Sequence, residues 1–240
     1  MQSSLDQFIE HAKEYTVIPV WKELVADLIT PVSAFERIVG NQPGFLLESV
    51  EHGERWSRWS FIGRNPLLTI KKVNNELLIE GEIPVELDDN GQILELVRTL
   101  QRNLSAPQIE NFPPMYSGLL GYLGYDTVRE VEELPMPAND DLQVPDAILS
   151  VIGEVAAFDH WSQRVFLIAN AIVKPHSSES EIKDSYYETK NRLDSLMFDG
   201  AKPLSEPLLD PPNLDQDLID VHPTMSQDDY CGIVEKAKNY

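Results

Sequence analysis

Residues 147–173 read AILSVIGEVAAFDHWSQRVFLIANAIV and decide the fold, because two long apolar runs stand side by side in the chain. The runs flank Asp159–Gln163, a polar segment with the composition of a turn. We therefore predict two long strands, 147–159 and 164–173, joined as a hairpin. The Asp159-His160 pair is also compatible with acid–base chemistry, but a hairpin turn with polar tips is the simpler interpretation.

Shorter strands are predicted upstream of this hairpin. FLLES (45–49) reads as one strand and WSRWSFIG (56–63) as a second. Alternation divides the second segment into two faces: Trp59 and Phe61 on one, and Trp56, Arg58 and Ser60 on the other.

A further hairpin is predicted from LLTIKKV (67–73) and ELLIEG (76–81), joined by Asn74-Asn75. Downstream, MYSGLLGYLGYD places glycines at 118, 121 and 124. Glycines within a strand usually mark bulges or close backbone contact, so we predict close sheet packing there and no phosphate-binding loop.

Helices are predicted where a capping residue precedes apolar residues at helical spacing. These are a helix capped by Ser4, one with a Ser33–Glu36 capping box that ends at Gly40, one over 93–104, and one with a Ser178–Glu181 capping box. Together with the strands they predict an α+β fold of packed antiparallel β-sheets with flanking helices.

The composition changes after residue 198. Residues 199–223 are rich in proline and carboxylates and read as an acidic linker. Residues 224–240 then start another helix, which Ser226 can cap. We predict a domain at 1–198, a linker at 199–223 and the first helix of a truncated domain at 224–240, because an isolated helix this short is marginal in water.

The overall composition excludes several classes of protein. The chain has 240 residues and a formal net charge of −21. Such a surface repels phosphate backbones and anionic lipids, so we expect no nucleic-acid and no membrane partner. The single cysteine, Cys231, fits a reducing compartment, and the polar N-terminus lacks a signal core. We therefore expect a cytoplasmic protein.

The polar residues between 45 and 63 form a candidate binding site. Glu48 and Ser49 end a strand, where they can hold an ammonium or amide group. Arg55 and Arg58 can grip a carboxylate, and Trp56 or Trp59 can pack a flat ligand. These groups suit an amino acid, which carries both charges. A hairpin with paired surface charges and two core tryptophans is the alternative, and the residues alone leave it open.

No catalytic constellation is visible in the sequence. The five histidines are scattered without metal-ligand spacing, and Cys231 has no identifiable base. Glu130, Glu132 and Glu133 form an acidic run beside Arg129, which we interpret as a solvated face. A magnesium site there would need converging oxygen ligands.

Several stretches together resemble one family. TPVSAFERI, LLESVEHGERWSRWSFIG, GLLGYLGYD, VPDAILSVIGEVAAFDH and HPTMSQDDYCGIVEKAKNY occur in this order. They resemble anthranilate synthase component I, a chorismate-using enzyme of tryptophan biosynthesis, over essentially the whole chain. The resemblance implies a lyase that adds ammonia to chorismate and eliminates pyruvate to leave anthranilate. It also implies Mg²⁺ as cofactor and a glutamine amidotransferase subunit, component II, as the source of ammonia.

The same resemblance implies what this chain contributes. Members of the family are much longer, and the half not matched here carries the chorismate-binding and magnesium-binding residues. This part supplies scaffold and the site for feedback inhibition by L-tryptophan. Ser49 matches a serine that contacts the inhibitor, Glu48 is placed to hold its ammonium, and Arg58 matches a basic position of the pocket. By itself the chain is expected to be inactive and to bind tryptophan weakly.

Two alternatives remain at this point. Aminodeoxychorismate synthase component I is a related enzyme whose signature overlaps with this one. A stand-alone amino-acid-binding or interaction module is the alternative from a different class.

Overall fold

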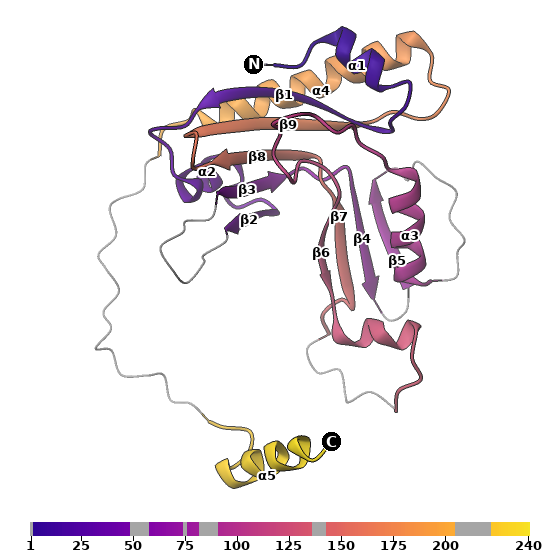
Figure 1. Ribbon diagram of the computed structural model, residues 1–240, viewed down its shortest axis with the longest axis vertical. Helices are drawn as coiled ribbons and strands as arrows, with labels where there is room; N and C mark the ends of the chain where they lie inside the picture. Colours follow the sequence, from indigo (N-terminus) through magenta and orange to yellow (C-terminus); the bar gives the residue numbers. More distant parts are fainter. Residues whose placement is uncertain (1, 49–57, 74–75, 82–90, 136–142, 205–221) are drawn as a thin grey trace. The chain divides into compact units, whose positions relative to one another are not determined.

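The computed structural model describes residues 2–48, 58–73, 76–81, 91–135, 143–204 and 222–240 (Figure 1). The chain forms two compact units, Met1–Leu204 and Ser205–Tyr240. The predicted boundary after residue 198 falls within the last turn of a helix, and most of the predicted linker lies outside the described residues. The three-part division therefore stays a prediction.

The first unit contains two antiparallel sheets, which confirms the predicted α+β class. One sheet has five strands in the order β1-β9-β8-β3-β2. Its strands are β1 (Val17–Val25), β9 (Arg164–Ile172), β8 (Glu154–Asp159), β3 (Trp59–Arg64) and β2 (Gly44–Glu48). The other has four strands in the order β5-β4-β7-β6. These are β5 (Glu76–Gly81), β4 (Leu68–Val73), β7 (Ala147–Val151) and β6 (Leu119–Leu123).

One predicted strand is wrong, because the apolar run 147–159 forms two strands in different sheets. The chain leaves the four-stranded sheet after Val151 and enters the five-stranded sheet at Glu154 (Figure 1). Gly153 lies at the crossing, where an added Cβ would be 1.9 Å from the Asn65 carbonyl oxygen. Only a residue without a side chain fits this approach, so Gly153 allows the two sheets to share one segment.

A second glycine confirms the predicted close backbone contact. Gly121 in β6 has a φ of +154°, and a Cβ there would lie 1.9 Å from the Ile148 carbonyl oxygen of the neighbouring strand. This position therefore excludes every residue with a side chain.

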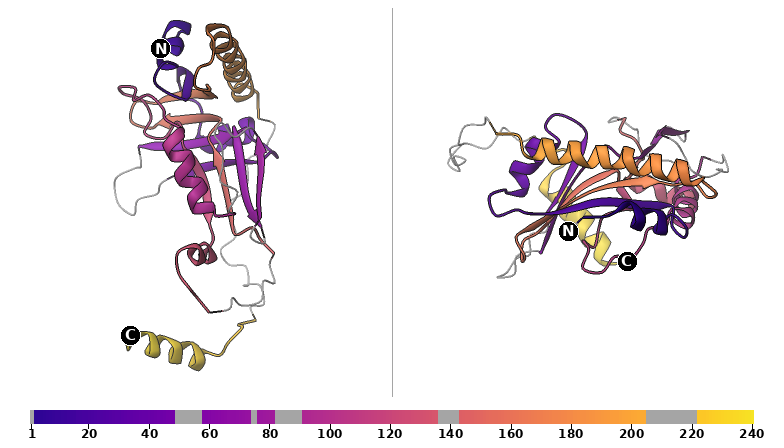
Figure 2. Two further views of the ribbon diagram at one scale, coloured as in Figure 1. Left: turned by 90° about the vertical axis from the view of Figure 1, so that its right-hand side faces the viewer. Right: turned by 90° about the horizontal axis from the view of Figure 1, so that it is seen from above.

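Three helices cover one face of the five-stranded sheet: α1 (Leu5–His11), α2 (Pro31–Ile38) and α4 (Glu179–Gly200). Figure 2 shows the long helix α4 lying over this face of the sheet. The core between them includes Phe8, Ile62 and Leu196, all fully buried. Burying apolar side chains on this face is the main source of stability for the arrangement.

The helix caps agree with the prediction at three of four places, Ser4, Ser178 and Ser226. Ser4 and Ser178 form capping boxes as expected. The predicted Ser33–Glu36 box is wrong, because Thr30 caps α2 and exchanges hydrogen bonds with Ser33. Pro31 then occupies the first turn, where its missing N–H costs nothing.

The opposite face of the five-stranded sheet carries an aromatic cluster. Trp59 stacks on Phe61 with ring centroids 6.2 Å apart, and both contact this cluster. Trp59 is thus one of the predicted core tryptophans, whereas Trp56 lies outside the described residues.

Helix α3 (Ile93–Asn103) packs on the four-stranded sheet and is capped by a distant carboxylate. Its N-cap residue Gln92 makes no side-chain capping bond. Instead, Glu130 in the 3₁₀-helix η1 (Tyr125–Glu130) accepts from the backbone N–H of Ile93 and of Leu94, each at 2.9 Å. Lys72 of β4 donates to the same carboxylate. The predicted solvated face is therefore wrong for Glu130, whose side chain is only 8% exposed.

The Glu130 cap predicts loss of stability in acid. Burial raises the pKa of the Glu130 carboxyl, but the bonds from Lys72, Leu94 and Ile93 outweigh burial and hold the pKa below its ordinary value of 4.5. A carboxylate whose folded pKa is lowered stabilises the fold above its unfolded pKa, and this contribution disappears as the pH falls through the folded pKa. We expect the unfolding free energy from urea titrations to fall below pH 4.5.

The variant Glu130→Gln should show a shallower fall over the same pH range, because it lacks the titrating group. Glu132→Gln, an exposed neighbour in the same acidic run, is the matched control and should follow the parent curve. Parallel curves for Glu130→Gln and the parent would contradict the assignment.

Helix α5 (Gln227–Lys238) belongs to the second unit and begins at the predicted cap, Ser226, which accepts from the Asp229 N–H at 3.2 Å. All of its residues are exposed within the described chain. Among the described residues, no helix is both long and apolar enough to cross a membrane.

Candidate functional site

Two of the predicted site residues, Glu48 and Arg58, lie at one end of the five-stranded sheet. Strand β2 ends at Glu48, and β3 begins at Trp59, directly after Arg58. Ser49 and Arg55 lie outside the described residues. The geometry can therefore be followed for Glu48, for Arg58 and for the side chains around them.

Glu48 belongs to a chain of three hydrogen-bonded side chains. Ser60 of β3 donates to Glu48 Oε1 at 3.2 Å, and its Oγ lies 2.7 Å from Nε2 of His160. Ser60 is 3% exposed, whereas Glu48 and His160 both reach the surface. A buried hydroxyl thus connects a surface carboxylate with a surface imidazole.

The order of these three residues differs from that of a hydrolytic triad. In a triad the histidine lies between the acid and the hydroxyl, so that it can take the hydroxyl proton. Here the serine lies in the middle and donates to the carboxylate. The arrangement is suited to fixing the position of Glu48, and it does not activate Ser60 as a nucleophile.

Arg58 is held in place by Asp159, the residue that ends β8. Its Nε and Nη2 donate to the two carboxylate oxygens at 3.1 and 2.8 Å, a bidentate contact. The guanidinium also lies 4.9 Å from the ring centre of Trp59 and 5.1 Å from that of Trp161. Although Asp159 is 3% exposed, 45% of the Arg58 side chain reaches solvent.

Both charges of this pair are stabilised by the contact. The Asp159 hydrogen bond raises the pKa of the Arg58 guanidinium. Burial raises the pKa of the Asp159 carboxyl, but the bonds from Arg58, Ser162 and the Trp161 N–H outweigh burial and lower it. Asp159 therefore acts as a fixed anion and not as an acid–base group at neutral pH.

The two sets of polar groups lie on opposite faces of the sheet. Glu48 pairs with Ser60, and Trp59 pairs with Asp159, so the register puts Ser60 and Asp159 on opposite faces. Arg58 precedes β3 and bonds to Asp159, so its side chain reaches the Asp159 face, and the alternation that predicted it on the face of Ser60 is wrong for this residue. A ligand that contacts both Glu48 and Arg58 must therefore lie across the end of the sheet. Such a ligand would present a cationic group to Glu48 and an anionic group to Arg58.

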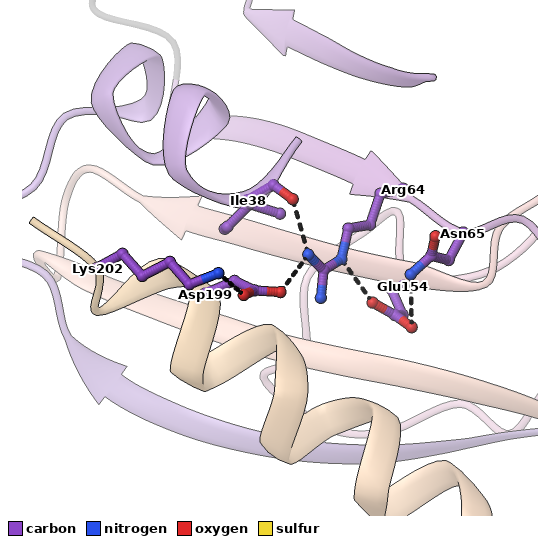
Figure 3. Close-up of polar contacts among 6 residues, drawn as sticks. All are labelled: Ile38, Arg64, Asn65, Glu154, Asp199 and Lys202. Atoms are coloured by element: carbon purple, nitrogen blue, oxygen red, sulfur yellow. Dashed lines mark hydrogen bonds and ion pairs between the residues drawn. The ribbon is translucent and has the colours of Figure 1, made fainter. Parts of the chain in front are cut away.

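A second polar cluster lies on the helix-covered face, centred on Arg64 (Figure 3). Arg64 Nε donates to Glu154 at 2.8 Å, while Nη1 donates to Asp199 at 2.6 Å and to the Ile38 carbonyl at 2.8 Å. Asn65 donates to Glu154, and Lys202 pairs with Asp199. The cluster joins β3, β8, α2 and α4, and all its charges are matched within it.

The residues described here do not fit a metal site. No group of three or more His, Cys, Asp or Glu side chains in the described parts of the chain could hold a metal ion. The Glu154 and Asp199 carboxylates are already bound to Arg64. A cavity of about 200 Å³ lies elsewhere, between β1, α3 and β6, and contains none of the predicted site residues.

Sequence reasoning found Glu48 and Arg58 but missed the role of their partners. Ser60 was assigned only to a strand face, and Trp161 was not singled out. The Asp159-His160 pair was the one available signal, because two polar residues follow an apolar strand there. Asp159 binds Arg58 on one face of the sheet, and His160 contacts Ser60 on the other.

Comparison with known proteins identifies relatives over most of the chain. Residues 43–240 match the family model of chorismate binding enzymes. Anthranilate synthase component 1 of Acetivibrio thermocellus is 31% identical over 240 residues, covering 99% of this chain and 48% of the relative. The protein of the same name from Mycolicibacterium smegmatis is 37% identical over 207 residues, which cover 86% of this chain and 38% of the relative. The chain thus spans less than half the length of these relatives.

A solved structure supports the fold. The crystal structure of anthranilate synthase component I from Streptococcus pneumoniae aligns with a TM-score of 0.55 at 22% sequence identity. The alignment covers 90% of this chain and 44% of that protein. At this identity the match supports the fold alone.

Proposed function

The chain belongs to the family of chorismate binding enzymes, and we propose that it is the N-terminal part of an anthranilate synthase component I. The observation that carries the proposal is the 31% identity to a protein of that name across 99% of this chain. The complete enzyme would be a cytoplasmic lyase of tryptophan biosynthesis. It would convert chorismate and ammonia to anthranilate and pyruvate.

The chemistry would take place outside this chain. Ammonia adds to the ring of chorismate, the ring hydroxyl leaves, and the enolpyruvyl group is then eliminated as pyruvate. Chorismate and Mg²⁺ would be bound by the part of the relatives that this chain does not match. The described residues do not fit a metal site, so the residues that would hold Mg²⁺ belong to that part. A glutamine amidotransferase subunit, component II, would supply the ammonia.

The residues of this chain would regulate the reaction by binding L-tryptophan at the end of the five-stranded sheet. Glu48 would accept from the ligand ammonium, and the Nη1 group of Arg58, outside the contact with Asp159, would face the ligand carboxylate. Ser49, next to Glu48 in sequence, would contact the same ligand. Inhibition would follow if tryptophan binds more tightly to an inactive arrangement of the enzyme.

Product analysis tests the proposed reaction. Full-length gene product supplied with chorismate, ammonium and magnesium should release fluorescent anthranilate, whereas the 240-residue chain should release none. An aminated chorismate that retains its enolpyruvyl group would instead indicate aminodeoxychorismate synthase component I. Anthranilate from the 240-residue chain alone would contradict the proposed division of labour.

A stand-alone amino-acid-binding or interaction module is the second candidate. The exposed Glu48 and Arg58 favour it only if the 240-residue chain binds L-tryptophan tightly without the other half. Calorimetric titration of the chain with L-tryptophan separates the two candidates.

A further inference from the structure

We infer that Ser60 and His160 are positioning residues, which hold the Glu48 carboxylate in the orientation that receives a ligand ammonium. The inference rests on the proposed tryptophan site and adds two residues that touch no ligand themselves. Their contribution would be selectivity for a ligand that carries an ammonium group.

The backbone fixes both positioning residues. Ser60 lies inside the sheet, paired with Glu48 of β2 on one side and Phe158 of β8 on the other. His160 follows β8 directly, and its N–H donates to the Arg58 carbonyl at 2.9 Å, which extends the ladder beyond the last pair. The Ser60 hydroxyl and the His160 ring are therefore presented by rigid structure, whereas Glu48 ends an edge strand.

The direction of the hydrogen bonds follows from the number of protons. The Ser60 hydroxyl has a single hydrogen and lies within bonding distance of two groups. An ionised Glu48 can only accept, so the hydroxyl hydrogen must point to Oε1. In the tautomer that satisfies both contacts, Nε2 of His160 carries a hydrogen and donates to the Ser60 oxygen. The hydrogen bonds therefore run from His160 as donor, through Ser60, to Glu48 as acceptor.

This direction explains how the set could serve a cation. A carboxylate that rotates freely loses orientational entropy when a ligand fixes it. Here Oε1 is already engaged by a buried hydroxyl, whose own oxygen is polarised by the imidazole N–H. Oε2 of Glu48 takes no part in this series of hydrogen bonds, and it is the oxygen that we assign to the ligand ammonium.

A double-mutant cycle in the full-length gene product tests the inference. The readout is the concentration of L-tryptophan that halves anthranilate formation, relative to each variant's own uninhibited rate. Glu48→Ala and Ser60→Ala should each raise it, by about tenfold for Glu48→Ala and by about fivefold for Ser60→Ala. If Ser60 acts only through Glu48, the double variant should match Glu48→Ala alone. Multiplied effects would show that Ser60 acts independently, and would overturn the inference.

Variants of His160 give a second test, because they separate a hydrogen-bond role of the imidazole from a role in packing alone. His160→Leu removes the donor and should raise the inhibitory concentration about as much as Ser60→Ala. His160→Gln keeps an N–H near the position of Nε2 and should restore most of the affinity. His176→Asn, at an exposed position with a φ of +68° that asparagine tolerates, is the control and should match the parent. Equal effects of leucine and glutamine would contradict the hydrogen-bond role.

The outcomes separate the inference from the proposed site. An unchanged inhibitory concentration in Glu48→Ala would refute the tryptophan site itself, and the inference with it. Weaker inhibition in Glu48→Ala with parent-like inhibition in Ser60→Ala and His160→Leu would refute the inference alone. Urea unfolding of each variant establishes that the sheet end is folded in every comparison.

Discussion

Replacing Arg64 with methionine should lower the free energy of unfolding by about 3–5 kcal/mol, because it leaves the buried Glu154 carboxylate without its charged partner. The Arg64 side chain is 11% exposed and contacts Glu154, Asp199 and the Ile38 carbonyl. Glu154 is the most affected, since its side chain is 2% exposed and would keep only the amide of Asn65 as a donor. Asp199 retains Lys202.

The measurement is urea unfolding at neutral pH followed by circular dichroism. Arg98→Met removes an exposed pair with Glu95 on α3 and is the matched control, with an expected change below about 0.5 kcal/mol. The double variant Arg64→Met/Glu154→Met should be more stable than Arg64→Met, because it also removes the unpaired charge. If the single variant unfolds like the parent, the cluster in Figure 3 does not hold α2 and α4 to the sheet.

Local signals predicted most of the individual elements correctly. The hairpin of β4 and β5, the cap at Ser178 and the strand that starts near Trp59 all depend on residues close together in sequence. Capping boxes and alternation describe interactions over a few residues, so a single sequence is enough to detect them.

Two of the errors in the fold concern contacts between residues far apart in sequence, and the third is a local choice between two possible caps. The split between β7 and β8 depends on the Asn65 carbonyl approaching Gly153, a contact that the apolar run itself does not show. Ser33 and Thr30 both have capping potential, and Pro31 fits only the helix that begins after Thr30. Glu130 looks like part of a solvated run until Lys72 and the start of α3 are placed beside it.

The candidate site shows the same division. The residue types at Glu48 and Arg58 predicted a site for a charged ligand, and both side chains lie at one sheet end. The partners Asp159 and His160 come from a different strand about a hundred residues away, and only the register of β3 and β8 reveals them. That register also places the two sets on opposite faces, which restricts where a shared ligand can lie.

The variant Ser49→Phe should make the full-length gene product about 10- to 100-fold less sensitive to L-tryptophan, since overfilling a packed site typically costs 1–3 kcal/mol. Ser49 follows Glu48 directly in sequence, and β2 ends at Glu48, where the proposed ligand would contact both Glu48 and Arg58. A phenyl ring occupies far more space than a hydroxyl and cannot accept from the ligand. The expected result is a large rise in the inhibitory concentration of L-tryptophan, measured against the uninhibited rate of the same variant.

Ser195→Phe is the matched control, because it makes the same exchange at an exposed position of α4. It should leave the inhibitory concentration at the parent value. Parent-like inhibition in a folded Ser49→Phe enzyme would place the tryptophan site elsewhere. Reduced inhibition in Ser49→Phe together with the predicted effects at Glu48 would instead show that the ligand contacts both of these consecutive residues, where β2 ends.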